Sequence, residues 1–154
     1  MNTPIVRNWM TVNPITITPQ TTLPNVRRLM HDHHLRLLPV LNNGNLVGVV
    51  TWRDIHQAET WDGVDFGGPE QNSLLEHLTA KEFMSYRPLM ITPDLTLDQA
   101  AYLMVDHKIG GLPVVEFGRL VGVITETDIC RSMLQWKIVV SNSEPILDTP
   151  LENA

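Results

Sequence analysis

Gly122-Val123-Ile124-Thr125-Glu126-Thr127-Asp128-Ile129 decides the fold of this chain, because it leads from a buried strand directly into a helix. The β-branched apolar run predicts the strand. Thr-x-x-Asp predicts the start of the helix, with Thr125 at the cap and Asp128 in the first turn. The N–H groups of that first turn have no partner inside the helix. They are therefore available to an anion, a phosphate included.

The same pattern occurs 74 residues earlier, in the stretch Gly48-Val49-Val50-Thr51-Trp52-Arg53-Asp54-Ile55. Residues 9–55 align with residues 83–129 without a gap, and 22 of these 47 positions are identical. Self-similarity of this kind indicates an internal duplication. We therefore expect both halves to have one fold.

Each half is predicted to be a β-α-β-β-α unit. Its first strand ends at a proline, its first helix begins at a capping threonine, Thr22 or Thr96, and a glycine turn joins its second and third strands. The predicted strands are residues 15–18, 37–41 and 46–51 in the first half, and 89–92, 112–115 and 120–125 in the second. The fold class is α/β (α+β), with two pseudo-symmetric repeats and a three-stranded sheet in each.

The predicted organisation is a first repeat over residues 1–56, a linker over 57–80, a second repeat over 81–136 and a tail over 137–154. A half of ~50 residues buries too little surface to be stable alone. The halves should pack sheet face to sheet face around a pseudo-two-fold axis. Within the linker, residues 61–70 are expected to form a loop and 73–78 a helical turn. The end of the tail is expected to be mobile.

Composition and charge exclude several classes of function. The hydrophobic content of 43% is enough for a core. No apolar run approaches the ~20 residues that span a bilayer, and the N-terminus lacks the regions of a signal peptide. The formal net charge of −6 argues against direct nucleic-acid binding, but it leaves phosphorylated small molecules open. The lone Cys130 forms no internal disulfide, which favours the cytoplasm.

The duplicated unit resembles a tandem pair of CBS (cystathionine-β-synthase-type) domains, the arrangement called a Bateman module. The resemblance covers residues 5 to about 135 and lies in three motifs that both halves share: Leu-Pro-Val, Leu-Val-Gly-Val and Thr-x-x-Asp-Ile. It implies a non-enzymatic regulatory module that binds an adenosine-containing ligand in clefts between the repeats. The implied ligands are AMP, ADP or ATP, with S-adenosylmethionine or NAD as further candidates. The resemblance also implies a homodimer whose state a separate effector protein reads.

The resemblance further implies that the motif aspartate accepts hydrogen bonds from the ribose hydroxyls, since a carboxylate offers two acceptor atoms to a cis-diol. The motif threonine would bond the phosphate or the ribose. Because the clefts of the family are composite, each Asp and Thr faces the other repeat. The first set is Thr51 and Asp54 with Leu89, Ile109, Gly110 and Pro113. The second set is Thr125 and Asp128 with Ile15, Leu35, Arg36 and Pro39.

The two copies differ where ligand specificity should be decided. Arg36 has Gly110 as its counterpart, so it is expected to make the Asp128 cleft the better phosphate site. Arg53, whose counterpart is Thr127, would do the same for the Asp54 cleft. Glu126 is a like charge beside any phosphate, and Trp52 could cover the mouth of its cleft.

Alternative interpretations exist for most of these residues. Thr-x-x-Asp is also simply a good helix cap, and the whole module could serve for interaction only, with vestigial clefts or clefts filled by Arg36 or Trp52. An enzyme acting on a nucleotide phosphate is the third hypothesis, although no metal or base accompanies the motif. His31 and His34 have the spacing of a helical metal pair but lack further ligands. Cys130 is expected to be buried and inert, and His33 and His107 to be structural.

Overall fold

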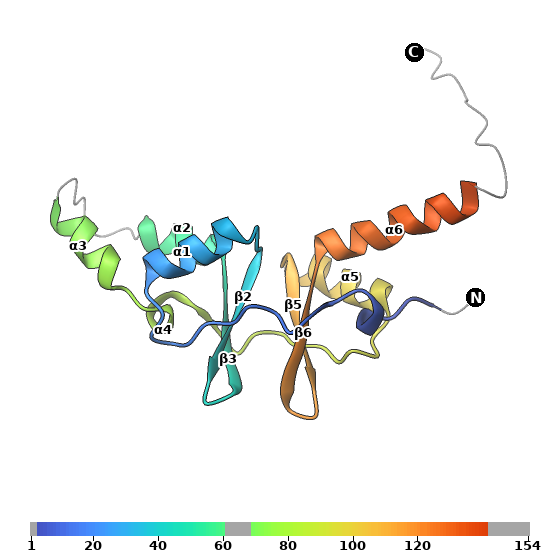
Figure 1. The fold of residues 1–154 in the computed structure, drawn as a ribbon, viewed down its shortest axis with the longest axis horizontal. Helices are drawn as coiled ribbons and strands as arrows, with labels where there is room; N and C mark the ends of the chain where they lie inside the picture. The colour runs from blue at the N-terminus through green and yellow to red at the C-terminus, as the bar shows by residue number, and fades with distance from the viewer. Residues whose placement is uncertain (1–2, 61–68, 142–154) are drawn as a thin grey trace, which may run out of the picture.

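The computed structural model describes residues 3–60 and 69–141, and it contains two three-stranded antiparallel sheets. Each sheet consists of a hairpin and one short strand. The first sheet has the order β2 (Leu37–Asn42), β3 (Asn45–Thr51), β4 (Ser85–Tyr86), and the second has the order β5 (Gly111–Glu116), β6 (Arg119–Thr125), β1 (Thr11–Val12). The two hairpins lie side by side at the centre of the molecule, with the helices of each repeat to the outside (Figure 1). The predicted α/β repeat architecture is confirmed.

Both hairpins turn where the sequence predicts. Asn43 and Gly44 have φ of 50° and 80°, and Phe117 and Gly118 have φ of 50° and 73°. Two successive residues at positive φ define the tight turn that matches the twist of paired strands. The register is also the same in the two hairpins, with Pro39 opposite Val49 and Pro113 opposite Val123.

The prediction of strands at residues 15–18 and 89–92 is wrong. Each of these segments makes only an isolated parallel bridge to the hairpin of its own half, Ile17 to Val40 and Ile91 to Val114. Prolines flank both segments, and a proline has no N–H to donate to a ladder. The third strand of each sheet comes instead from β1 and β4, which precede these segments.

The two halves exchange these short strands. β1 belongs to the first half of the chain but pairs with β6, and β4 belongs to the second half but pairs with β3. Residues next to these short strands also pack into the core of the other half. Val6, in the 3-10 helix η1 (Val6–Asn8), is fully buried in the core of the second repeat. Ala80, in α4 (Ala80–Phe83), is buried in the core of the first.

The helices begin at the residues that the caps indicate. α1 (Leu23–Asp32) follows Thr22, and α5 (Leu97–His107) follows Thr96, whose capping box with Gln99 is complete. α2 (Trp52–Glu59) and α6 (Glu126–Ser141) follow Thr51 and Thr125. Two bounds differ from the expectation. α6 continues past residue 136, where the second repeat was expected to end, and α3 (Pro69–His77) includes residues 69 and 70, which were expected in a loop. The remainder of that loop, residues 61–68, and the tail from 142 lie outside the described residues.

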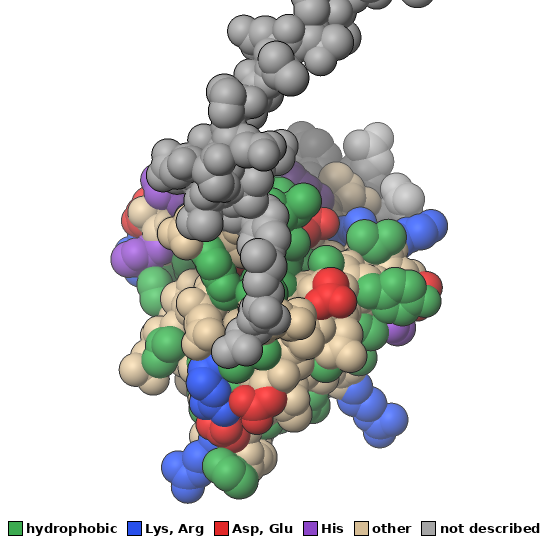
Figure 2. All heavy atoms as spheres, turned by 90° about the vertical axis from the view of Figure 1, so that its right-hand side faces the viewer, with side chains coloured by type: hydrophobic (Ala, Val, Ile, Leu, Met, Phe, Trp, Pro, Cys, Tyr) green, Lys and Arg blue, Asp and Glu red, His purple; other side chains and the backbone are tan. Residues whose placement is uncertain are grey.

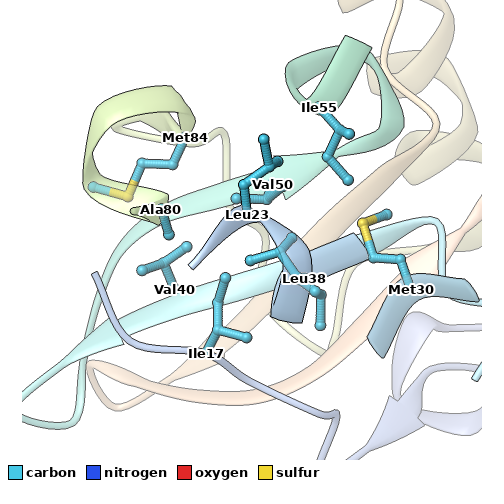
Figure 3. Close-up of a cluster of buried hydrophobic side chains, with 10 residues drawn as sticks. Ile17, Leu23, Met30, Leu38, Val40, Val50, Ile55, Ala80 and Met84 are labelled. Atoms are coloured by element: carbon cyan, nitrogen blue, oxygen red, sulfur yellow. The ribbon is translucent and has the colours of Figure 1, made fainter. Parts of the chain in front are cut away.

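Three clusters of buried side chains hold the fold together. The first packs α1, α2 and α4 against the first hairpin, with Leu23, Leu38 and Ile55 pointing toward one another (Figure 3). The second is its counterpart around Leu112 and Ile124. The third cluster consists of Leu37 and Val49 from the first sheet and Val123 from the second. This third cluster confirms that the repeats pack sheet to sheet.

Candidate functional site

A cavity of about 570 Å³ opens between the two repeats at the start of α2. Such a volume lies in the range of small-molecule sites. All eight residues of interest around Asp54 line this cavity: Thr51, Trp52, Arg53, Asp54, Leu89, Ile109, Gly110 and Pro113. The structure therefore brings together residues that are up to 62 positions apart, from both halves of the chain.

Asp54 is the buried carboxylate of this cavity, with only 8% of its surface exposed. Its Oδ2 accepts hydrogen bonds from the backbone N–H of Thr51 at 2.7 Å and from Thr51 Oγ1 at 2.9 Å. Its Oδ1 accepts a hydrogen bond from Ser85 Oγ at 2.8 Å. The aspartate thus caps α2 through one oxygen and presents the other to the hydroxyl of an exchanged strand.

Apolar groups form another part of the lining. Leu37 and Val49 come from the first hairpin, and Leu89, Ile109 and Pro113 come from the second repeat. The indole of Trp52 borders the cavity and is fixed by a hydrogen bond from Nε1 to the carbonyl oxygen of Leu35 at 3.2 Å. An apolar slot beside a buried carboxylate matches the two ends of a nucleoside, the flat base and the ribose diol.

The sequence analysis did not assign several of the lining residues to a site: Ser85, Tyr86, Arg87, Pro88, His107 and Lys108. They lie in β4, in the turn after it and at the end of α5, none of which carries a binding motif. Arg36 also lines this cavity, although the sequence assigned it to Asp128. His107 is exposed rather than structural, and His33 is exposed as well, so the expectation for both is wrong.

Asp128 repeats the cap geometry of Asp54. Its Oδ2 accepts from the backbone N–H of Thr125 at 2.9 Å and from Thr125 Oγ1 at 3.1 Å, and it is 6% exposed. Its Oδ1 faces Arg131, whose Nη1 donates at 3.4 Å, where Asp54 has a serine. Glu126 and Thr127 are exposed beside it.

The other residues assigned to the Asp128 cleft lie in the first repeat. Ile15 and Leu35 are half-buried against the first core, and Pro39 is fully buried in β2. A ligand site that joins them to Asp128 stays a prediction.

Two other candidate groups can be placed. His31 and His34 are exposed at the end of α1, and within residues 3–60 and 69–141 no three His, Cys, Asp or Glu side chains gather as metal ligands would. Cys130 is exposed on α6, so the expectation of a buried thiol is wrong. In the described part of the chain, no helix combines the length and the apolar character needed to cross a bilayer.

Comparison with family models matches the CBS domain twice, at residues 6–59 and at residues 80–135. Among curated proteins, the CBS domain-containing protein YhcV of Bacillus subtilis is 32% identical over 129 residues, which are 84% of this chain and 85% of YhcV. Inosine-5'-monophosphate dehydrogenase of Korarchaeum cryptofilum is 36% identical over 116 residues, 75% of this chain. The chain spans only 21% of that dehydrogenase.

Two solved structures share the fold and carry adenosine compounds. CBSX2 of Arabidopsis thaliana in complex with AMP is 30% identical, with a TM-score of 0.71, and the match covers 87% of this chain and 99% of that one. The CBS domain pair of MJ0100, in complex with 5'-methylthioadenosine and S-adenosyl-L-methionine, is 25% identical with a TM-score of 0.72. That match covers 88% of this chain and 99% of the other.

Proposed function

The chain belongs to the CBS-domain family, and from this premise we propose that it is a regulatory module which binds an adenosine-containing ligand in the Asp54 cavity. The observation that carries the proposal is the position of Asp54, a buried carboxylate at the edge of an apolar cavity that both repeats build. The AMP complex of CBSX2 and the methylthioadenosine and S-adenosylmethionine complexes of MJ0100 support an adenosine compound as the ligand.

In the proposed complex, the ribose hydroxyls donate to Asp54. Oδ1 accepts one of them when the hydroxyl of Ser85 gives way, and Oδ2 keeps its bonds to Thr51 and holds the carboxylate in place. The adenine lies among Leu89, Ile109 and Pro113, where it removes apolar surface from water. Because these groups come from both repeats, the ligand stabilises the closed arrangement of the two halves.

Regulation follows from this arrangement by a shift of populations. A ligand that binds one arrangement of the repeats more tightly than another increases the fraction of the first. An effector protein that binds one of these arrangements more tightly would then respond to the ligand concentration. The module itself needs no chemistry at the cavity, so we propose that it is not an enzyme. The cytoplasmic location expected from the lone cysteine stays a prediction.

Asp54→Ala tests the proposal, with Asp128→Ala as its matched control. Both variants lose the same pair of cap bonds, so they should lose similar stability, but only the first loses a carboxylate of the cavity. We expect Asp54→Ala to weaken binding of AMP, ADP or ATP by about 10- to 100-fold, the usual effect of removing hydrogen bonds to a charged acceptor. Asp128→Ala should leave binding at this cavity unchanged.

Titration calorimetry of the full chain with AMP, ADP, ATP, S-adenosylmethionine and NAD gives the affinities. The absence of binding by any of these compounds at millimolar concentration would contradict the proposal. It would favour the second hypothesis, an interaction module with a vestigial cleft. The open volume beside Arg36 and Trp52 argues against a cleft that side chains fill.

The proposed assembly is a homodimer. α5 and α6 pack against each other, and each carries large apolar side chains on the surface, Tyr102 and Val105 on α5 and Met133 and Leu134 on α6. Figure 2 views this end of the molecule and shows hydrophobic side chains at its surface. Apolar side chains gathered on neighbouring helices are typical of an interface between protein chains.

Light scattering after size exclusion tests the dimer. We expect a mass of about two chains for the wild type and one chain for Val105→Glu, because burying an unpaired carboxylate at an interface is unfavourable. Phe117→Glu is the control, since Phe117 is more exposed than Val105, 97% against 77%, but lies at the tip of a hairpin. A wild-type monomer at micromolar concentration would rule the dimer out.

A further inference from the structure

We propose that the Asp54 cavity is built for an adenosine polyphosphate, ADP or ATP, and that Arg87 and Lys108 bind its phosphates. This inference depends on the proposed function above and adds the chemical class of the ligand. It rests on the charges around the cavity, on the backbone beneath two of them and on the contrast with the other half of the chain.

The charged side chains that line the cavity are mostly cations. The described lining contains four of the eleven Lys and Arg residues of the chain, namely Arg36, Arg53, Arg87 and Lys108. It contains one of the seventeen Asp and Glu residues, Asp54. In a protein of net charge −6, this concentration of cations is local to the cavity. A concave surface lined by one sign of charge concentrates the opposite charge.

These four cations have no carboxylate partners among the described side chains. The ion pairs of Lys and Arg found there involve Arg7, Arg27 and Arg131 instead. The one carboxylate of the cavity is already bonded on both oxygens, by Thr51 and by Ser85. The cationic charge at the cavity is therefore available to a ligand.

At one of these cations, Arg87, the backbone conformation would favour asparagine over arginine. Arg87 and Lys108 have φ of 50° and 54°. This is a left-handed backbone conformation, which residues other than Gly and Asn adopt at a cost in free energy. Their counterparts 74 residues earlier, Asn13 and His34, have φ of 49° and 52°. The backbone is thus the same in both halves, and the first half has asparagine where the second has arginine.

Helix capping accounts for part of this pattern. Lys108 is the left-handed residue that ends α5, where a cation is favourable near the negative end of the helix dipole. Arg87 follows a two-residue strand and has no helix end beside it. Its charge is explained by the cavity that it lines.

The equivalent positions in the other half contain no Lys or Arg. Arg36, Arg53, Arg87 and Lys108 correspond to Gly110, Thr127, Asn13 and His34 at the constant offset of 74. Trp52 corresponds to Glu126. The Glu126 carboxylate lies near Gly110, outside the cavity lining, at 3.6 Å from where a Cβ at Gly110 would be. This contrast reverses the expectation from the sequence, which took the Asp128 cleft as the better phosphate site because of Arg36.

The charges also rank the adenosine compounds. Each added phosphate brings more negative charge to the four cations, so affinity should increase from adenosine to AMP, ADP and ATP. S-adenosylmethionine has a sulfonium cation and no phosphate, so it lacks the negative phosphate charge that the four cations attract. The cavity should therefore bind ATP and ADP most tightly and S-adenosylmethionine weakly.

Arg87→Asn and Lys108→His test this inference, because each puts the residue of the first half onto the same backbone conformation. Calorimetry with ATP, ADP, AMP, adenosine and S-adenosylmethionine gives the affinities of the unmodified chain and of both variants. We expect ATP to bind the wild type about 10-fold or more tightly than AMP, and each variant to bind ATP about 10-fold more weakly, as for the loss of one charge-assisted hydrogen bond. Adenosine affinity should change less than about 2-fold, since adenosine has no phosphate to contact.

Arg119→Asn is the control for net charge, since it removes a cation from the end of the other hairpin, outside the cavity lining. It should leave ATP affinity unchanged, and thermal melting without ligand should show all three variants folded. If adenosine compounds bind but ATP is no tighter than AMP, or both cavity variants bind ATP like the wild type, the polyphosphate inference is overturned and the proposed function stands. If no adenosine compound binds, the proposed function itself fails.

Discussion

At the scale of single residues, Asp54 and Asp128 show that the same motif builds the same helix cap twice. Both caps have the same two bonds from threonine, and both carboxylates are buried. The group that meets Oδ1 differs, Ser85 in one half and Arg131 in the other. At Asp54 the cap is compatible with the proposed ligand site, because the cap uses Oδ2 and the proposed ribose contact uses Oδ1.

Sequence could predict the residues of the site that belong to a local motif. Thr51 and Asp54 are recognisable because the start of a helix imposes its own spacing, three residues apart. Ser85, Arg87 and Lys108 reach the same cavity from β4 and the end of α5, and only the packing of the two repeats brings them there. Arg87 and Lys108 have one signal in the sequence, because they are cations where the first half has Asn13 and His34. Ser85, whose counterpart is Thr11, has none.

Asp98 gives a pH prediction at the same scale. The hydrogen bond with Thr96, together with backbone N–H groups at the start of α5, lowers the pKa of Asp98 below its ordinary 3.8. A lowered pKa in the folded state stabilises the fold above the pKa of the unfolded state, and this stabilisation is lost as the pH falls through the folded value. Asp98→Asn should therefore lower the melting temperature at about pH 6 and make little difference at about pH 2. An equal difference at both values would contradict this role.

At the scale of elements, each hairpin depends on a contact between a glycine and a methionine. A Cβ added at Gly48 would lie 2.6 Å from Met84 Sδ and 2.9 Å from the carbonyl oxygen of Ser85. A Cβ at Gly122 would lie 2.7 Å from Met10 Sδ and 2.8 Å from the carbonyl oxygen of Thr11. The matched methionines Met10 and Met84 therefore pack over the glycines and hold the exchanged strands against the hairpins.

Gly48→Ala and Gly122→Ala should each destabilise the protein by about 1–3 kcal/mol, because the added methyl group overlaps with backbone as well as with a side chain. Chemical denaturation monitored by circular dichroism gives the free energies of unfolding. Gly110→Ala is the control, since the nearest atom to its added Cβ is a side-chain oxygen of Glu126 at 3.6 Å. Equal losses in all three variants would show that the contact with methionine is unimportant.

The elements with strong local signals were the ones that the sequence predicted well. The hairpins have paired turn residues and the helices have threonine caps, so their positions follow from residues close in the chain. β1 and β4 have only two residues each and lack a pattern of alternation. They are strands only because β6 and β3 offer them an edge, which is a property of the tertiary structure.

At the scale of the whole molecule, the exchange of segments makes the two repeats interdependent. Val6 is fully buried in the second core, and its backbone N–H donates to the carbonyl oxygen of Leu95 at 2.8 Å. Arg7, from the first half of the chain, forms ion pairs with Asp94 and Glu116 of the second repeat. Val6 and Arg7 thus pack with the second repeat, which the division of the sequence at residue 56 does not reveal.

Val6→Ala should destabilise the protein by about 2 kcal/mol, because it leaves a cavity in the second core. Val12→Ala should change the stability by less than about 0.5 kcal/mol, since Val12 lies on the exchanged strand but is largely exposed. Thermal and chemical unfolding of the two variants provide the comparison. A similar small effect of both substitutions would mean that the N-terminal segment contributes little to the second repeat.

The exchange also has a consequence for biosynthesis. The ribosome makes β1 first, yet its partner β6 is made more than 100 residues later. The first hairpin likewise waits for β4, which follows it by more than 30 residues. A nascent chain therefore cannot complete one repeat before it starts the other, and β1 is synthesised before the other described strands but is among the last of them to find its partner.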